Sequence, residues 1–363
     1  MRILQVIPGK IWGGAEQYIV DLGSGLKIRG HEIIYACYDI ESVTSRLKSW
    51  VNEFTVFPNF DIGYYRFIRI LKELVRDVDI VHIHDTSFIE PVSKALAKVN
   101  SNARIILTRH VSHRQPVGYF FRKSYAKLSS MICVSDFVRC QWLSSNRWFP
   151  EYKCRVVLNS IPDTHSNYGE SIRSKYNIPA DDALLMFCGR IRRSKGCDLL
   201  LDALAKVKKL NWHLVFIGSC HPKDYSIHLK NKAKSMNFAD KVHFYGFTRF
   251  SRDMMWQANI GVSPSLVKDS CPLTNLEFMQ RGVCVVTSSS GGQPECMVNG
   301  DSGFIVSPND ADALAATLQT LLDNQELRTR IGRNGQKYFE DNLSYQKFLN
   351  RIENVYLEAF IEG

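Results

Sequence analysis

Two carboxylates and a proline stand close together in the second half of the chain, in a pattern suited to an oxygen-rich ligand. Asp269 and Glu277 flank seven residues that include Pro272, and a helix-like segment follows. Proline is favourable at a helix start, and the free amides of that first turn attract phosphate or sugar oxygens. Glu277, about a turn further along, is placed to reach a ribose diol. The alternative is structural, with Asp269 as a helix cap and Glu277 as a solvated acid.

Two cations occupy a loop earlier in the chain. Gly189 and Arg190, and then Lys195, come between a predicted strand over residues 184–187 and a predicted helix over residues 198–208. In open α/β sheets, ligands bind at the carboxyl ends of the strands. Two fixed cations at that edge suit a diphosphate whose negative charge grows as it leaves. A solvated basic loop is the competing interpretation.

A glycine pair opens the first helix. Gly13 and Gly14 follow a short apolar strand over residues 3–7 and precede a predicted helix over residues 15–29. The run is not a dinucleotide fingerprint. Either a ligand approaches the backbone closely at these glycines, or they form only a helix-entry turn.

Several acids and histidines look like metal ligands, and we assign none of them to a metal. His82, His84 and Asp85 have the right residue types, but His82 and His84 alternate at the end of one strand, as buried structural histidines do. The pattern Asp-x-Asp occurs at residues 77–79 and 310–312, in each case ahead of a structural element. The sequence therefore predicts no metal site and no bound cofactor.

Taken in chain order, these motifs resemble the retaining glycosyltransferases of family 4. Enzymes of that family have the GT-B fold and transfer a sugar from a nucleotide-sugar, and the likeness is to those that build bacterial cell-surface polysaccharide and lipopolysaccharide. The resemblance covers nearly the whole chain. Besides the acid pair and the cation loop, the matching segments are Gly13-Gly14-Ala15-Glu16, His110 in Leu107-Thr108-Arg109-His110, Val134-Ser135 and Asn159-Ser160-Ile161-Pro162-Asp163.

The resemblance implies a role for each matching residue. Arg190 and Lys195 would neutralise the departing diphosphate, and Asp269 would hold the donor sugar. The implied catalytic set is Arg190, Lys195, Asp269 and His110, and the implied donor-binding set is Glu277, Gly13, Gly14, Gly189, Leu273 and Thr274. The chain departs from the family pattern where Asp269 replaces Glu, and where Pro272 and Ser160 replace Gly. The aspartate is one methylene shorter, and the proline has no N–H to offer a ligand.

Strands and helices alternate along both halves, which predicts an α/β protein with parallel sheets. A chain of 363 residues exceeds one comfortable core, so two domains are expected. We predict two Rossmann-like, doubly wound domains that face a cleft, joined by a polar linker over residues 159–182. The N-terminal, acceptor-side domain would be residues 1–160, and the nucleotide-sugar-binding domain residues 161–344. A last helix, residues 345–363, would cross back to the first domain, as in the resembling family.

Cysteine usage and hydropathy bear on the location of the chain. The ten cysteines show no Cys-x-x-Cys spacing, which indicates reduced core residues of a cytosolic protein. No window reaches the ~18 apolar residues that a membrane span needs. The protein is therefore predicted to be cytoplasmic, with at most peripheral contact to the inner face of the membrane.

The charge is uneven. The net charge is +10, and residues 101–150 carry eight Lys and Arg against one acid, Asp136. No nucleic-acid-binding module is present, so an anionic lipid surface or an anionic acceptor accounts for the basic segment better. Residues 64–72 and 117–128 each predict a helix with basic and aromatic residues, suited to a membrane interface or to a core-packed stripe. The residues assigned to the acceptor or membrane side are His113, Arg114, Arg122 and Lys123.

The function predicted from sequence is transfer of a sugar, with retention at the anomeric carbon, from a nucleotide diphosphate sugar to a glycan or lipid-linked acceptor. Two alternatives stay open on the sequence. One is a nucleotide-sugar epimerase of the same architecture. The other is a non-catalytic protein that binds sugar nucleotides or glycans.

Overall fold

The computed structural model describes residues 1–9, 11–58, 60–163, 170–209, 211–220, 222 and 224–361. Within these ranges the side chains of residues 60–64 and 120 are not described. Parts of two predicted segments therefore lie outside the described residues, namely residues 164–169 of the linker and Lys10 in the glycine loop, and in the two aromatic segments the side chains of Tyr64 and Phe120 are not described. The chain divides into two compact units, residues 1–162 with 345–363 (unit 1) and residues 163–344 (unit 2).

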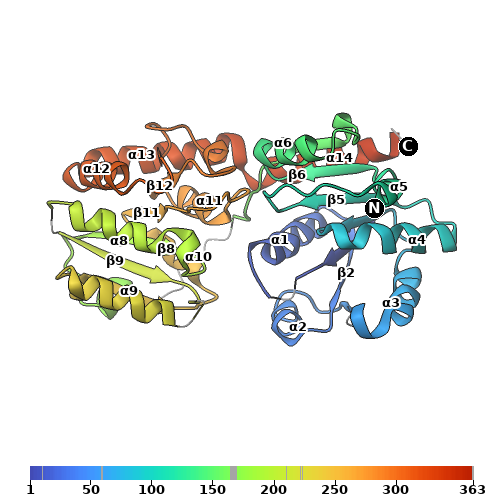
Figure 1. Ribbon diagram of the computed structural model, residues 1–363, viewed down its shortest axis with the longest axis horizontal. Coiled ribbons are helices and arrows are strands. Elements are labelled where there is room, and N and C mark those ends of the chain that lie inside the picture. Colours follow the sequence, from blue (N-terminus) through green and yellow to red (C-terminus); the bar gives the residue numbers. More distant parts are fainter. Residues whose placement is uncertain are drawn as a thin grey trace. The chain divides into compact units, whose positions relative to one another are not determined.

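Unit 1 is built on a parallel sheet whose strand order is β3-β2-β1-β4-β5-β6-β7 (Figure 1). The central strands are buried along their whole length, as expected for a sheet covered on both faces. The strands are β1 Arg2–Ile7, β2 Glu32–Tyr38, β3 Thr55–Phe57, β4 Ile80–Ile83, β5 Arg104–Arg109, β6 Ser130–Cys133 and β7 Cys154–Val156. The helices are α1 Gly14–Ile28, α2 Glu41–Leu47, α3 Phe60–Leu74, α4 Ile89–Val99, α5 Arg122–Tyr125, α6 Asp136–Ser145 and α14 Tyr345–Ile361.

The last helix, α14, is part of the core of unit 1 although it lies far away in sequence. Its apolar face packs with α1 and the strands, and Phe348, Ile352 and Tyr356 are almost fully buried. At its surface, Glu353 accepts hydrogen bonds from Arg29 and His31. Burying an apolar helix face removes it from water, which is the main favourable term in such packing.

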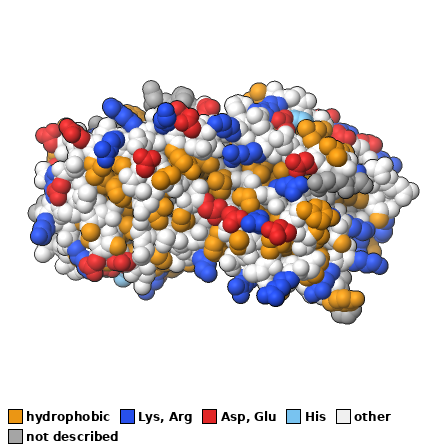
Figure 2. All heavy atoms as spheres, turned by 90° about the horizontal axis from the view of Figure 1, so that it is seen from above, with side chains coloured by type: hydrophobic (Ala, Val, Ile, Leu, Met, Phe, Trp, Pro, Cys, Tyr) orange, Lys and Arg blue, Asp and Glu red, His pale blue; other side chains and the backbone are white. Residues whose placement is uncertain are grey.

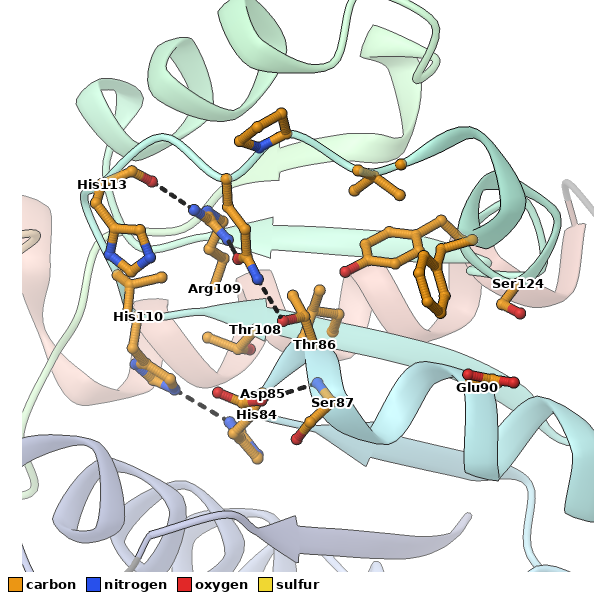
Figure 3. Close-up of a pocket in the computed structure, with 18 residues that line it drawn as sticks. His84, Asp85, Thr86, Ser87, Glu90, Thr108, Arg109, His110, His113 and Ser124 are labelled. Carbon is orange, nitrogen blue, oxygen red and sulfur yellow. Dashed lines mark hydrogen bonds between the residues drawn. The ribbon is translucent and has the colours of Figure 1, made fainter.

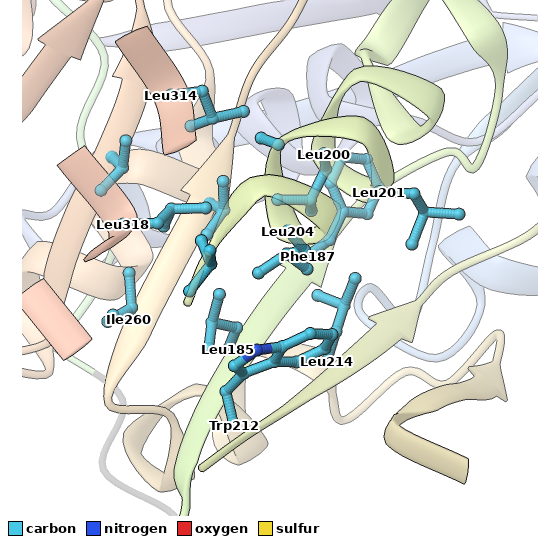
Figure 4. Close-up of a cluster of buried hydrophobic side chains, with 14 of the residues drawn as sticks. Leu185, Phe187, Leu200, Leu201, Leu204, Trp212, Leu214, Ile260, Leu314 and Leu318 are labelled. Carbon is cyan, nitrogen blue, oxygen red and sulfur yellow. The ribbon is translucent and has the colours of Figure 1, made fainter. Parts of the chain in front are cut away.

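Unit 2 has a second parallel sheet, in the order β10-β9-β8-β11-β12-β13. Its core lies between the sheet and α8 and α12, around Leu185, Leu200, Leu214 and Leu318 (Figure 4). The strands are β8 Ala183–Cys188, β9 Trp212–Ile217, β10 Val242–Gly246, β11 Ile260–Ser263, β12 Cys284–Ser288 and β13 Phe304–Val306. The helices are α7 Ile172–Lys175, α8 Cys197–Lys206, α9 Asp224–Ser235, α10 Ser251–Met254, α11 Leu273–Gln280, α12 Ala311–Asp323 and α13 Gln325–Tyr338.

The predicted fold class is confirmed, since each unit is a doubly wound parallel α/β sheet. The helix predicted over residues 117–128 is wrong. That segment forms a 3₁₀ turn, Tyr119–Phe121, followed by the four-residue helix α5. Pro116 and Gly118 interrupt the helical pattern ahead of it, and both residues line a cavity.

Candidate active site

The first group of candidate residues lies at the carboxyl edge of the unit 2 sheet. β8 stands between β9 and β11, so the strand order reverses direction there, which is the usual ligand position in such sheets. Gly189 and Arg190 follow β8, and Lys195 closes a 3₁₀ turn just ahead of α8. The loop after β11 carries Asp269 and leads into α11. The fold therefore brings the predicted cation loop and acid pair to one edge.

A short ion pair joins the two loops. Lys195 Nζ lies 2.6 Å and 2.7 Å from the two carboxylate oxygens of Asp269. Gly196 adopts a left-handed conformation with φ of 74°, and a Cβ there would come 1.9 Å from the carbonyl oxygen of Pro264. Only glycine fits this approach, because any side chain would push the loops apart. Two predicted site residues, 74 positions apart in sequence, thus form one ion pair.

The backbone of Asp269 is held from a second side. Gly292 N–H donates to the carbonyl of Asp269 at 2.7 Å. The neighbouring Gly291 has φ of 77°, and a Cβ on it would meet that same carbonyl oxygen at 2.2 Å. The Ser-Gly-Gly-Gln-Pro stretch after β12 therefore holds the backbone of the loop that carries Asp269.

Glu277 lies on α11 and is paired as well. Its Oε1 accepts from Arg252 Nε at 3.0 Å, and both side chains are largely buried. Burial raises the pKa of the Cys188 thiol at the end of β8, and the nearby Glu277 carboxylate raises it further. Glu277 therefore points toward the end of β8. Arg252 comes from α10, and sequence reasoning missed it because no motif surrounds it.

The remaining residues predicted for the donor differ in their surroundings. Arg190 is exposed, and among the described residues it has no hydrogen-bond or ion-pair partner. Leu273 and Thr274 open α11, where Pro272 takes the cap position and no side chain caps the helix. In unit 1, the backbone N–H of Gly13 donates to Glu16 Oε2 at 2.8 Å, so the glycine pair forms the entry turn of α1.

The second group of candidates lies at the carboxyl edge of the unit 1 sheet, around three histidines. His82 lies 2.7 Å from both Thr108 Oγ1 and Tyr356 Oη. His84 Nε2 lies 2.8 Å from Gln5 Oε1, and its Nδ1 lies 3.1 Å from His110 Nε2 (Figure 3). The polar atoms of the cluster are thus joined in hydrogen-bonded chains inside the fold.

Burial keeps these histidines neutral. It lowers the pKa of His82 to about 3 and that of His110 to about 4, and it lowers the pKa of His84 well below the usual value of 6.5. Because Gln5 Oε1 only accepts, His84 Nε2 carries the proton and its Nδ1 accepts from His110 Nε2–H. The three neutral imidazoles therefore form hydrogen bonds without carrying charge.

A cavity of about 550 Å³ opens beside His110 (Figure 3). It lies at the ends of β4 and β5 and under the loop that follows β5. His113 and the buried Arg109 line it, whereas Arg114 is exposed and does not. Further lining residues are Asp85, Thr86, Ser87, Glu90, Gln115, Ser124 and Tyr125.

The other residues assigned to the acceptor or membrane side lie on the surface nearby. The Arg122 guanidinium stands over the rings of Trp148 and Tyr119, at 5.3 Å and 5.8 Å from their centroids. Lys123 is exposed. On the face drawn in Figure 2, Lys and Arg side chains are scattered among acidic and apolar ones.

The acids that could suggest a metal have structural roles. Asp79 accepts from the backbone N–H of Arg2, and Asp310 caps α12 by accepting from Ala313 N–H. Asp312 pairs with Lys206. Within the described ranges, no three His, Cys, Asp or Glu side chains are grouped in a way that would hold a metal ion. Nor does any helix in that part of the chain combine the length and apolarity needed to cross a bilayer.

The comparisons with known proteins now identify the family. Residues 12–165 match the model of Glycosyltransferase Family 4, and residues 169–338 match that of Glycosyl transferases group 1. The chain therefore belongs to the group 1 glycosyltransferases of family 4, and the predicted enzyme class is confirmed. Like the rest of that class, it is a nucleotide-sugar-dependent transferase with the GT-B fold.

Relatives of the chain fit this placement. An uncharacterized glycosyltransferase of Methanocaldococcus jannaschii is 25% identical, with 96% of this chain and 95% of the relative covered. The O-antigen biosynthesis glycosyltransferase WclY of Escherichia coli is also 25% identical, with 80% and 82% covered.

Solved structures share the fold. A glycosyltransferase from Rickettsia africae superposes with a TM-score of 0.85 at 22% identity, covering 99% of this chain and 98% of that one. Anabaena HepE, in a complex with UDP and glucose, superposes with a TM-score of 0.84 at 17% identity, and 98% of each chain is covered.

Proposed function

We propose that this glycosyltransferase moves a sugar, with retention at the anomeric carbon, from a nucleoside diphosphate sugar to a glycan or lipid-linked acceptor of cell-surface polysaccharide synthesis. The observation that carries the proposal is the Lys195–Asp269 pair, which joins the two ligand-facing loops of unit 2 at the point where the strand order reverses. O-antigen and capsular polysaccharide enzymes among the relatives support the pathway.

The charges around that pair suit a diphosphate leaving group. As the bond from the anomeric carbon to the diphosphate oxygen breaks, negative charge grows on that oxygen, and Lys195 and Arg190 supply fixed positive charge. The acceptor hydroxyl oxygen forms the new bond to the carbon, and its proton passes to the departing phosphate. No strong protein nucleophile is needed, because the carbon is oxocarbenium-like at this stage.

The remaining residues would orient the donor. Glu277, held by Arg252, would accept from the ribose hydroxyls, and the amides of Leu273 and Thr274 would donate to phosphate oxygens. Asp269 would contact the donor sugar while it remains paired with Lys195. In unit 1, His110 would contact a sugar hydroxyl, and the backbone at Gly13 and Gly14 would lie against donor or acceptor. No metal is required in this arrangement.

Donor turnover tests this proposal directly. The purified chain would be supplied with UDP-, GDP- and ADP-sugars, and release of the nucleoside diphosphate would be measured with and without candidate glycan acceptors. UDP-glucose is the first choice, because HepE was crystallised with it. Proton NMR of the product gives the anomeric configuration. Inversion would remove the retaining assignment, and isomerisation of the donor without transfer would point to an epimerase.

We further propose that the chain is cytoplasmic and docks reversibly on the inner face of the membrane. Tyr119 and Phe121 are 77% and 54% exposed beside Arg122 and Lys123. Each basic residue near an anionic leaflet contributes about 1 kcal/mol. Co-sedimentation with anionic vesicles should therefore be strong at low salt and lost at high salt. Charge reversal of Arg122 and Lys123 to Glu should weaken it, and an indifferent wild-type protein would contradict the proposal.

A further inference from the structure

The cavity beside His110 contains a buried cation that forms no direct ion pair. Arg109 ends β5, and its side chain is only 2% exposed, with the guanidinium 5.0 Å from the ring centroid of Trp142. Its hydrogen-bond partners are neutral, since Nη1 donates to Gln115 Oε1 at 2.8 Å and Nη2 to the carbonyl of His113 at 2.6 Å. Its Nε is buried without a partner. Among the described residues, no carboxylate forms an ion pair with it; burial lowers the pKa of the guanidinium, and the nearby Asp85 carboxylate opposes that shift.

An unpaired buried cation is costly, and proteins normally place a counter-charge beside it. The acids that line the same cavity do not serve that purpose. Asp85 is exposed, and its Oδ1 accepts from the backbone N–H of Ser87 at 2.8 Å. Glu90 pairs with Lys94 at 2.6 Å. The cavity therefore has a positively charged wall, and its nearest carboxylate, Asp85, acts on Arg109 without forming an ion pair with it.

The rest of the lining suits a small polar group rather than an apolar one. Gln115 is held at both ends of its amide group, since its Nε2 donates to Thr86 Oγ1 at 3.0 Å while its oxygen accepts from Arg109. Ser87 and Ser124 add hydroxyls. The guanidinium fork matches the planar, two-oxygen geometry of a carboxylate or phosphate.

We propose that this cavity binds an anionic group of the acceptor, a phosphate or a carboxylate, and that the Arg109 guanidinium is its binding cation. The assignment of the anion to the acceptor rests on the proposed function, because His110, the residue proposed to contact the donor sugar, lines the same cavity. The anion would supply the direct ion pair that Arg109 does not form with any described carboxylate.

Arg109 also holds the loop after β5 through His113 and Gln115, so a loss of activity on mutation would not by itself reveal an anion site. The first experiment is therefore a titration of the wild-type chain with inorganic phosphate or acetate at constant ionic strength, followed by calorimetry. The variants are Arg109→Gln, Arg109→Lys and a matched control, Arg147→Gln, which removes an exposed arginine that does not line the cavity. Lys195→Gln removes binding at the diphosphate site.

We expect Arg109→Gln to weaken phosphate or acetate binding by about tenfold or more, the scale of a lost charge-assisted hydrogen bond. Arg109→Lys should retain part of the affinity, and Arg147→Gln and Lys195→Gln should retain the Arg109-dependent binding. Equal affinities in the wild type and Arg109→Gln would overturn the proposal. If Arg109→Gln does not fold, the Arg109→Lys and wild-type titrations decide, and a wild type that binds neither anion overturns it.

The second experiment distinguishes a phosphate from a carboxylate ligand. It also tests the anion site separately from the proposed transferase function. Transfer is measured to glucose, glucose 6-phosphate and glucuronate, with the donor identified by turnover. The preferred anionic sugar should have the lower KM, and Arg109→Gln should abolish the preference while donor hydrolysis continues. Donor hydrolysis with no anionic preference would refute the anion site and leave the transferase proposal intact. Arg109-dependent phosphate binding with no turnover of any donor would support the anion site and refute the transferase proposal.

Discussion

The two units handle charge in opposite ways at the corresponding edges of their sheets. In unit 2 each candidate acid is matched by a cation, Asp269 with Lys195 and Glu277 with Arg252. In unit 1 the histidines are held neutral, and Arg109 is buried without a counter-ion. Both edges are built from the ends of parallel strands, so the difference comes from the side chains and not from the fold.

This contrast bears on what each edge can bind. Ion pairs are able to exchange partners, so a ligand that carries both hydroxyls and phosphates can take over both members of a pair. A lone buried cation gains from an anion alone, and neutral imidazoles offer hydrogen bonds without charge. Unit 2 therefore suits a nucleotide-sugar, and unit 1 suits sugar hydroxyls beside one anionic group.

The largest loss of turnover is expected when a cation is removed from unit 2. Lys195→Ala or Arg190→Ala should lower turnover by about 10²–10³-fold, because each variant removes charge stabilisation of the leaving diphosphate. Steady-state kinetics on the folded variants measures the effect. The matched control is Arg193→Ala, which lies in the same turn with its side chain 74% exposed. Near-normal rates in both test variants would remove the diphosphate assignment.

The neutral histidines of unit 1 predict a pH-dependent stability. Their folded pKa values lie below 6.5, so the unfolded chain binds more protons and stability falls as the pH drops below about 6.5. The loss should be about 2 kcal/mol per histidine between pH 7 and pH 5. Urea unfolding across that range measures the slope. His82→Gln should reduce the slope, because it removes one of the three buried histidines. Equal slopes in His82→Gln and the wild type would contradict the account.

A smaller effect is expected at the second pair of unit 2. A contact with the ribose is shared by the ground and transition states, so Glu277→Gln should raise the donor KM by about tenfold and change kcat less. Arg252→Gln should also raise the donor KM, because Arg252 holds the Glu277 carboxylate in place. A fall in kcat at an unchanged KM would instead put Glu277 in the chemical step.

The elements were predictable from sequence where the pattern was long and buried. The strand predicted over residues 184–187, which is β8 in the structure, was found because it is a continuous apolar run. The three-residue strands β3 and β7 were missed, since they are too short to show a period. The spacing of the aromatic residues over 117–128 resembles that of a helix, but these side chains pack against residues outside the segment. Tyr125 stacks on Trp142 and Arg122 covers Trp148, both from beyond that segment.

The candidate site was predictable as a set of residues but not as a set of contacts. Motifs located Lys195 and Asp269 separately, and nothing in their spacing indicates that they pair across 74 positions. Arg252 lies outside every motif quoted from the sequence. Arg109 stood within a quoted motif, next to His110, yet only the structure shows that its side chain is buried beside a cavity.

The comparison of the two units also predicts an effect that should be absent. Lys195 and Arg190 give unit 2 two cations for the proposed diphosphate, so charge neutralisation there does not depend on a metal. Activity should therefore be unchanged in excess EDTA, measured as nucleoside diphosphate release by dialysed protein with and without added magnesium or manganese. The Lys195→Ala variant sharpens the test, since a metal should restore part of its rate if it can replace the lost charge. Full loss of wild-type activity on chelation, recovered with magnesium, would show that acids or histidines assigned here to structure bind a metal in catalysis.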